Sequence, residues 1–259
     1  MKAHKDQDLL DFTLTVIPVE AIHEETQSRI EKEGIPFNHA LTKALLKWFK
    51  HSFFKWVDKP QCECGQAGQI VGTDRPNQSE SIDPKSLLLS RKGRCGEWAN
   101  AFTLVCRAMG LEVRYVLDFT DHVWTEIYCD VQNRWIHCDS CEESFDSPLL
   151  YSEGWGKKLN YVFAVGDTEV RDVTRKYVKD FKECSSRRNM CAERLVNNTA
   201  YFLTSKLRSS LSPLYVNELN LRDFKEIQAL FSQQINWGEL KGRQTGSVEW
   251  RTARGEMGK

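Results

Sequence analysis

A cysteine stands at the start of an apolar helical pattern in the stretch Arg94-Cys95-Gly96-Glu97-Trp98-Ala99-Asn100-Ala101-Phe102. Apolar residues continue at helical spacing as far as Met109, and Gly110 is a typical helix stop. A thiol in the first turn of a helix lies at the positive end of the helix dipole, which favours the thiolate. Arg94 adds positive charge beside it. The stretch therefore predicts a helix that begins at a reactive Cys95.

Two strand-like runs downstream offer the groups that a reactive thiol needs. A thiol nucleophile requires a base, and the base requires a third group that fixes its tautomer. His122 opens the first run and Asp139 closes the second. Taken singly, the three residues have ordinary interpretations, as a packing thiol, a structural histidine and a turn-forming aspartate. Together they predict Cys95 as nucleophile, His122 as base and Asp139 as the group that orients the base.

The two runs are expected to form a hairpin closed by residues 129–132. If Tyr128 pairs with Asn133 across that loop, His122 lies opposite Asp139. The other pairs that this register predicts on the same face are Trp124 with His137 and Glu126 with Trp135. A face that carries an imidazole, carboxylates and indoles is expected to be the wall of an active site rather than of a core.

A further run of β-forming residues, Val113 to Phe119, lies between the predicted helix and the predicted hairpin. Together with the predicted hairpin, this run indicates three strands after the helix.

Four motifs occur in a fixed order along the chain. They are residues 93–100, 118–126, 134–139 and 154–161. Weaker motifs are residues 46–57, 172–174, 186–188 and 242–251. In sequence and spacing this set closely resembles the cytosolic peptide:N-glycanase family, peptide-N4-(N-acetyl-beta-glucosaminyl)asparagine amidases of the transglutaminase-like superfamily. The resemblance implies an α+β fold with a transglutaminase-like (papain-like) core, in which a catalytic helix packs on an antiparallel sheet, and with flanking helical arms.

The resemblance also implies an activity and a set of substrate-binding residues. Family members cleave the amide between an asparagine side chain and the first N-acetylglucosamine of an N-glycan on misfolded glycoproteins, which supports proteasomal degradation of those proteins. Glu126, Trp135, Glu142 and Trp155 match positions that line the family's cleft for the chitobiose core, and Trp124 joins them on the predicted face. Indole faces cover the apolar faces of sugar rings, and carboxylates accept hydrogen bonds from hydroxyl groups.

The chain departs from the family at its structural zinc site. Family members carry two CxxC pairs upstream of the nucleophile. Here the first pair is compressed to Cys62-Glu63-Cys64, and no second pair precedes Cys95. Two thiolates do not complete a tetrahedral site, and the CxxC spacing of Cys138 and Cys141 is wrapped around Asp139. We expect no metal here and no cofactor for the chemistry.

Composition restricts the partners and the compartment. The 36 basic and 36 acidic residues cancel, which favours neither nucleic acid nor an acidic membrane surface as a partner. The sequence shows no apolar run of membrane-spanning length and no signal-peptide pattern at its start. Nine cysteines, one of which must act as a free thiol, indicate a reducing setting. We expect a cytoplasmic protein that is also compatible with the nucleus.

Five segments are predicted. They are an N-terminal helical arm (1–60), a zinc-lobe remnant or loop (61–92), the catalytic core (93–180), C-terminal helices (181–240) and a mobile tail (241–259). In the family, helical arms contact ubiquitin-receptor shuttle proteins that bring substrates to the proteasome. The candidate contact segments here are Leu46 to Val57 and Leu219 to Trp237.

Two alternatives to an active amidase remain open at this point. The shortened zinc lobe is compatible with an inactive module that only binds the glycan. The thiol, imidazole and carboxylate are equally compatible with another papain-type thiol hydrolase, such as a peptidase. The intact Cys95 favours an enzyme, because a decayed site is free to lose its nucleophile.

Overall fold

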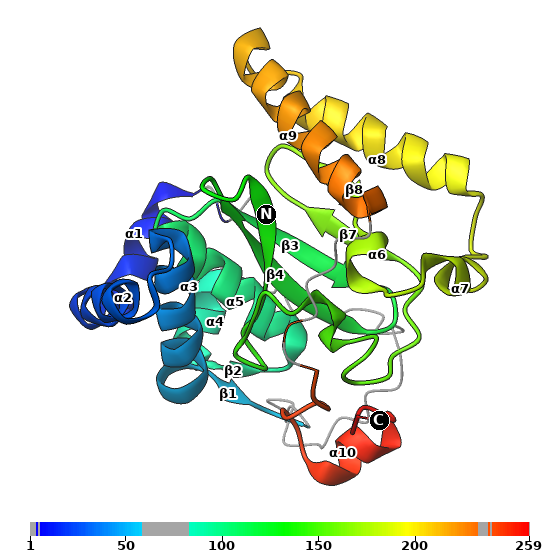
Figure 1. The fold of residues 1–259 in the computed structure, drawn as a ribbon. Coiled ribbons are helices and arrows are strands. Elements are labelled where there is room, and N and C mark those ends of the chain that lie inside the picture. Colours follow the sequence, from blue (N-terminus) through cyan, green and yellow to red (C-terminus); the bar gives the residue numbers. More distant parts are fainter. Residues whose placement is uncertain (1–3, 5, 59–82, 233–237, 239, 259) are drawn as a thin grey trace.

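A six-stranded antiparallel sheet organises the fold (Figure 1). The structure, a computed structural model, describes residues 4, 6–58, 83–232, 238 and 240–258. The strands lie in the order β6-β5-β4-β3-β7-β8. Their bounds are β3 (Val113–Asp118), β4 (His122–Cys129), β5 (Arg134–Asp139), β6 (Ser144–Phe145), β7 (Val162–Val165) and β8 (Val170–Asp172). The antiparallel sheet and the predicted α+β class are confirmed.

Helices from the first half of the chain cover one side of the sheet, as Figure 1 shows in blue and cyan. These are α1 (Gln7–Val16), α2 (Val19–Glu33), α3 (Phe37–Trp48), α4 (Pro84–Ser90) and α5 (Cys95–Ala108). α3 continues into a π-helical turn, Phe49–Phe53. The short strand β1 (Lys55–Trp56) then pairs in parallel with β2 (Lys92–Gly93), which directly precedes α5. α5 is the central helix of this layer and begins at Cys95, as predicted.

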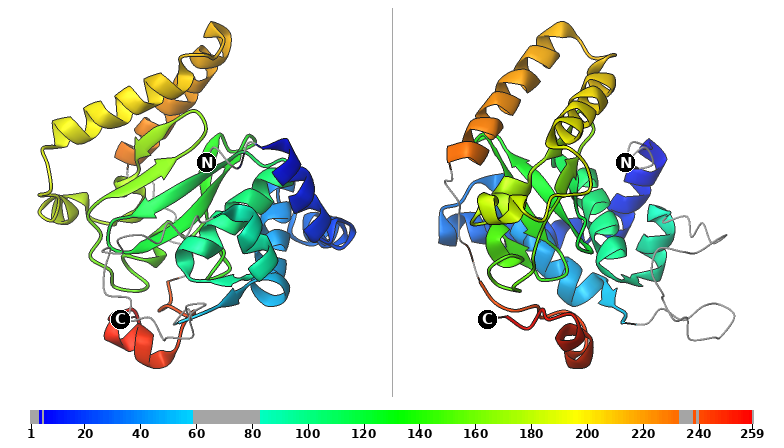
Figure 2. Two further views of the ribbon diagram at one scale, coloured as in Figure 1. Left: turned by 180° about the vertical axis from the view of Figure 1, so that it is seen from behind. Right: turned by 90° about the vertical axis from the view of Figure 1, so that its right-hand side faces the viewer.

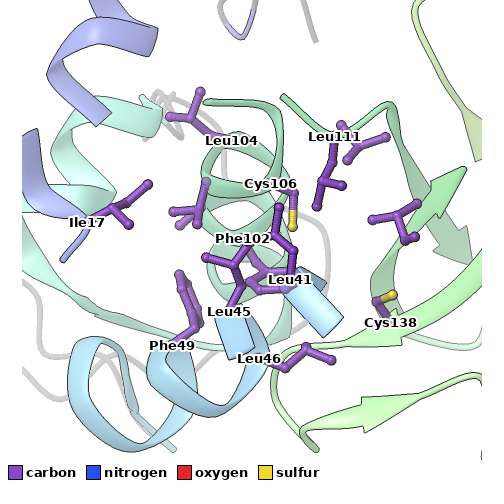
Figure 3. Close-up of a cluster of buried hydrophobic side chains, with 14 of the residues drawn as sticks. Ile17, Leu41, Leu45, Leu46, Phe49, Phe102, Leu104, Cys106, Leu111 and Cys138 are labelled. Carbon is purple, nitrogen blue, oxygen red and sulfur yellow. The ribbon is translucent and has the colours of Figure 1, made fainter. Parts of the chain in front are cut away.

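The main core joins these helices to the sheet (Figure 3). Leu45 and Phe49 of the N-terminal segment pack with Phe102 and Cys106 of α5 and with Cys138 of β5, and all five are buried. Residues of the segment 6–58 therefore share one core with α5 and the sheet.

The second half of the chain covers the opposite side of the sheet and then projects from it (Figure 2). The elements are a 3-10 turn (Pro148–Leu150), α6 (Thr174–Tyr177), α7 (Phe181–Ser185), α8 (Glu193–Arg208), α9 (Pro213–Ser232) and α10 (Val248–Ala253). α8 and α9 are the two helices expected after residue 185. None of the helices that the structure describes has the length and apolarity to cross a bilayer.

The register of the β4–β5 hairpin differs by two residues from the predicted one. Tyr128 pairs with Trp135 and Cys129 with Arg134, so the turn comprises residues 130–133. Asn133 has a φ of 51°, a left-handed conformation that asparagine tolerates better than most residues, which places it in the turn rather than in the strand. A shift of two residues leaves every side chain on its predicted face, whereas a shift of one would have reversed them.

Two predicted irregular segments are in fact structured. Residues 84–90, expected to be part of a loop, form α4, because Asp83 caps the backbone N–H groups of Lys85 and Ser86 and Pro84 occupies the first turn. The tail after residue 240, expected to be mobile, contains α10 and is hydrogen-bonded to the body of the protein. The low apolar content of this segment favoured a mobile tail, but polar contacts hold it against the body of the protein.

Replacing Phe102 by alanine is expected to destabilise the protein by about 3–5 kcal/mol, because it opens a cavity under α5 in the main core. Urea denaturation measures the loss. Phe202→Ala is the matched control, since that ring on α8 is 64 % exposed, and it should cost less than about 0.5 kcal/mol. Equal losses for the two variants would contradict the assignment of this core.

Candidate active site

The nucleophile is held at the first residue of α5. Arg94 precedes the helix in extended conformation, and its backbone N–H donates to Glu97 Oε2 at 2.8 Å. Its guanidinium also donates to the backbone carbonyl of Asp58, just beyond β1. These contacts fix the entry into the helix and leave Cys95 partly exposed at the N-terminal end. The helix dipole therefore acts directly on the sulfur.

The base and its orienting group meet across the sheet. His122 Nε2 lies 2.8 Å from Asp139 Oδ2, and both side chains are buried. Because Nε2 is engaged by the carboxylate, Nδ1 is the ring atom left for Cys95. His122 and Asp139, two residues of the predicted triad, are thus hydrogen-bonded despite the shifted register, and His122 also interacts electrostatically with Cys95.

Asp139 accepts four hydrogen bonds. His122 and the Tyr151 hydroxyl, the latter at 2.9 Å, donate to Oδ2. The backbone N–H groups of Cys141 and Glu142 donate to Oδ1 at 2.8 and 3.2 Å. A carboxylate with this many donors is held both in orientation and in charge state.

A relay that sequence reasoning missed lies behind this carboxylate. The backbone N–H of Ser147 donates to His137 Nδ1 at 3.2 Å, so the proton of the neutral ring lies on Nε2. His137 Nε2 is 2.7 Å from the Tyr151 hydroxyl, which in turn donates to Asp139. Burial lowers the pKa of His137 to about 4 and keeps it neutral. Tyr151 carried no sequence signal, because its contact depends on the 3-10 turn before it.

The three proposed catalytic groups have shifted pKa values that fit a thiolate–imidazolium pair. Burial opposes the charge on Asp139, but the charge of His122 and its hydrogen bond hold the pKa of that carboxyl well below its usual range. Burial likewise disfavours the imidazolium, yet the charge of Asp139 raises the pKa of His122. Burial raises the pKa of the Cys95 thiol, and the hydrogen bond to His122 with the charges of His122 and Arg243 outweighs this effect and lowers it. The site is therefore built for a charged sulfur.

The face predicted to be an active-site wall carries Trp124 and Glu126, which are both buried. Trp124 belongs to a second core, donates to the Tyr177 hydroxyl at 2.8 Å and stacks on Tyr151. Glu126 is in contact with Arg114, Lys176 and the same hydroxyl, and those partners lower its pKa to about 2 against the effect of burial. In this structure, both residues are held by protein contacts.

The other predicted substrate-binding residues are also buried, with different surroundings. Trp135 packs edge-on against Tyr128. Glu142 accepts hydrogen bonds from the backbone N–H groups of Gln244 and Thr245 at 2.8 and 3.1 Å. Trp155 packs against the His122 ring, with centroids 4.9 Å apart. Contact of any of these side chains with a sugar stays a prediction.

The predicted metal-binding remnant, Cys62 and Cys64, lies outside the described residues. Among the residues that are described, no group of three or more histidine, cysteine or acidic side chains could hold a metal ion. Cys138 and Cys141 are buried on either side of Asp139, and the Cys138 thiol donates to the carbonyl of Ile136. Both act as packing residues.

Comparison with known proteins matches this geometry to a family. The profile of the transglutaminase-like superfamily matches residues 63–140, and that of the Rad4 transglutaminase-like domain matches residues 119–230. A peptide-N(4)-(N-acetyl-beta-glucosaminyl)asparagine amidase of Yarrowia lipolytica is 35% identical over 99% of this chain and 81% of its own length. The chain belongs to this amidase family. The amidases of Macaca fascicularis and Homo sapiens are 41% and 40% identical over 98% of the chain. The chain spans 44% of the length of each of these two relatives.

Solved structures confirm the fold without extending the function. Rad4–Rad23 bound to a 6-4 photoproduct lesion superposes with a TM-score of 0.59 at 14% identity, over 90% of this chain and 54% of that one. Rad4–Rad23 crosslinked to undamaged DNA gives a TM-score of 0.58 at 15% identity, over 91% and 55%. At these identities the likeness concerns the fold alone.

Replacing Asp139 by asparagine is expected to lower the pKa of His122. The carboxylate stabilises the protonated ring, so its loss leaves burial, which opposes protonation, as the larger effect. An NMR titration of the His122 ring measures the shift. Asp172→Asn, which removes a carboxylate of β8 that binds Arg188 and Thr174, should leave the His122 titration in place. An unchanged His122 pKa in Asp139→Asn would contradict the electrostatic role of this carboxylate.

Proposed function

We propose that this chain is a thiol-dependent amidase that cleaves the bond between an asparagine side chain and the first N-acetylglucosamine of an N-glycan. The observation that carries the proposal is the buried His122–Asp139 hydrogen bond of 2.8 Å, together with the electrostatic interaction of His122 with Cys95 at the start of α5, in a chain that belongs to a family of such amidases. The pKa shifts of all three groups favour the charged form that nucleophilic attack requires.

The reaction follows from the positions of these groups. The Cys95 thiolate attacks the carbonyl carbon of the asparagine side-chain amide. As the carbon–nitrogen bond breaks, protonated His122 gives its proton to the departing nitrogen, which leaves as a glycosylamine. Water, deprotonated by His122, then cleaves the thioester, so that the asparagine becomes an aspartate and the thiolate is restored. Asp139 holds the imidazole in one orientation throughout.

The proposed substrates are unfolded N-glycoproteins whose deglycosylation supports their degradation by the proteasome. Every group in the proposed reaction is a protein side chain, so we propose no cofactor for the chemistry. The seven cysteines that the structure describes are free thiols, which supports a cytoplasmic or nuclear setting where a thiol nucleophile stays reduced.

Cys95→Ala is expected to abolish release of glycan from a denatured glycopeptide, because no thioester can form. Mass spectrometry follows the conversion of asparagine to aspartate. The released peptide is about 1 Da heavier per site than the unglycosylated asparagine peptide, because O replaces NH. Cys191→Ala is the matched control: this exposed thiol lies outside the site and its loss should leave the rate unchanged. Release at the wild-type rate by Cys95→Ala would refute the proposal.

The same assay separates the alternatives. The glycopeptide is offered beside its aglycosylated twin, since only an amidase of this type requires the sugar. Cleavage of the backbone of both peptides would indicate a peptidase instead. Binding of the glycopeptide by wild-type protein, with neither release nor alkylation of Cys95 by a chitobiose-linked reagent, would indicate an inactive glycan-binding module.

A partner surface is proposed on α9. Of the two candidate segments, Leu46 to Val57 is excluded as a surface by burial of its main apolar residues, Leu46, Phe49 and Phe53, in the core. α9 instead exposes Leu221 and Phe224, and it projects from the body of the protein (Figure 2). A ubiquitin-receptor shuttle protein is the partner class that the family resemblance implies. The Rad4 neighbour is likewise seen in complex with a partner, Rad23.

The double substitution Leu221→Glu and Phe224→Glu is expected to abolish capture of such a shuttle protein in a pull-down, because it places two charges in the apolar contact. Leu89→Glu on α4 is the control, since that exposed leucine lies away from α9. Undiminished capture by the double variant would exclude this surface. Failure of the folded wild-type chain to capture the shuttle protein would exclude the partner.

A further inference from the structure

Residues 241–258, here termed the C-terminal strap, are bound to the segments that flank all three proposed catalytic residues. The strap contacts are Ser247 N–H with the Asp58 carboxylate at 3.2 Å, Arg254 Nη1 with Asp121 Oδ2 at 2.8 Å, and Thr245 Oγ1 with the Cys141 carbonyl at 2.7 Å. Asp58 also receives the guanidinium of Arg94, next to Cys95. Asp121 precedes His122, and Cys141 follows Asp139 by two residues. The strap is therefore part of the frame of the site.

The strap also closes on itself, which fixes the backbone of Arg243. The N–H of Arg243 donates to the carbonyl of Glu256 at 2.8 Å. Beside it, a Cβ on Gly242 would lie 2.0 Å from the carbonyl oxygen of Met257, so only glycine permits this approach. The contacts within the strap thus fix the backbone of Arg243, from which its side chain extends.

The guanidinium of Arg243 is buried among aromatic rings. Its central carbon lies 4.6 Å from the centre of the Trp155 ring, 4.5 Å from Trp250 and 5.2 Å from Trp56. Nη1 donates to Glu256 Oε2 at 2.7 Å. Nε and Nη2, both buried, have no hydrogen-bond partner among the residues that the structure describes. Glu256 supplies one compensating negative charge, whereas the two unused donors of this buried cation have none.

Trp155 connects this cation to the proposed catalytic centre. The indole that lies under the guanidinium also packs on the His122 ring, at 4.9 Å. We propose that Arg243 is a positioning residue of the site, whose fixed positive charge acts with His122 to keep the sulfur of Cys95 in its thiolate form. The inference rests on the proposed function only for the benefit that the charge of Arg243 brings to catalysis. Its effect on the Cys95 thiol can be measured without a substrate.

The charges around the sulfur agree with this role. Burial has the largest effect and raises the pKa of Cys95. The hydrogen bond and charge of His122, followed by the charge of Arg243, lower this pKa, and the charge of Asp121 raises it. Tyr115 on β3 and Cys141 after β5 also interact with the sulfur, and neither brings a positive charge. Among the groups named in this paragraph, His122 and Arg243 supply the positive charges.

The test compares two substitutions that change the same ion pair in opposite directions. Arg243→Met removes the cation but keeps an apolar side chain for the indoles, whereas Glu256→Gln removes the carboxylate that neutralises the cation. The rate of alkylation of Cys95 by iodoacetamide is measured against pH, with the Cys95 peptide followed by mass spectrometry and the exposed Cys191 as internal reference. The midpoint of the Cys95 profile is expected to rise in Arg243→Met and to fall in Glu256→Gln. Below the midpoint, each unit of rise lowers the rate about tenfold.

The opposite signs distinguish charge from structure. Thr245→Val, which loosens the strap without changing a charge, should leave the midpoint in place, and Arg243→Lys should keep it near the wild-type value. Shifts of the same sign in Arg243→Met and Glu256→Gln, an unchanged midpoint in Arg243→Met, or an equal shift in Thr245→Val would each overturn the inference. If urea denaturation shows that Arg243→Met is not folded, the midpoints of Glu256→Gln and Arg243→Lys decide the question. A wild-type protein that alkylates as expected but releases no glycan would refute the proposed function and leave this inference standing.

Discussion

The buried hydrogen bond between His122 and Asp139 constrains the rest of the site. A carboxylate and an imidazole both lose hydration when they are buried, and neither retains its charge there without the other. The structure therefore surrounds Asp139 with four donors, two from the backbone of the following turn and two from side chains. The charge of the imidazole depends on that turn, on the hairpin register and on the second core, because together they place the donors around Asp139. The pKa of His122 is therefore set by the whole sheet rather than by one strand.

The aromatic and acidic side chains next to the triad support the site as much as they could bind a substrate. Trp124, Tyr151 and Trp155 form the wall behind His122, and Glu126 neutralises Arg114 in the same layer. Charged partners in such a layer are stable only as complete pairs, because removal of one leaves the other unpaired in a buried position. The residue types that suggested sugar binding are accordingly also those that build a rigid, polar core beneath the His122 imidazole.

The likeness to Rad4 shows how little the fold restricts the chemistry. The same arrangement of helix and antiparallel sheet occurs in Rad4–Rad23 bound to a 6-4 photoproduct lesion and in Rad4–Rad23 crosslinked to undamaged DNA, at 14–15% identity. In this chain the candidate site is built from side chains at the start of α5, on β4 and β5, and on the C-terminal strap. The fold holds this small number of positions at fixed distances.

Sequence alone determined the parts of this protein that depend on local pattern. The helix Cys95–Ala108, the antiparallel strands and the shared face of His122 and Asp139 follow from periodicities of 3.6 and 2, which tolerate an error of two residues in register. The α4 cap at Asp83 and Pro84 and the turn at Asn133 are also local features, set by residue type rather than by periodicity. Tertiary structure alone decided the relay from His137 through Tyr151 and the burial of Trp124 and Glu126. It also decided the place of Arg243, which lies in a polar segment far along the chain. These features arise from contacts between distant residues, and no local periodicity encodes which of them will meet.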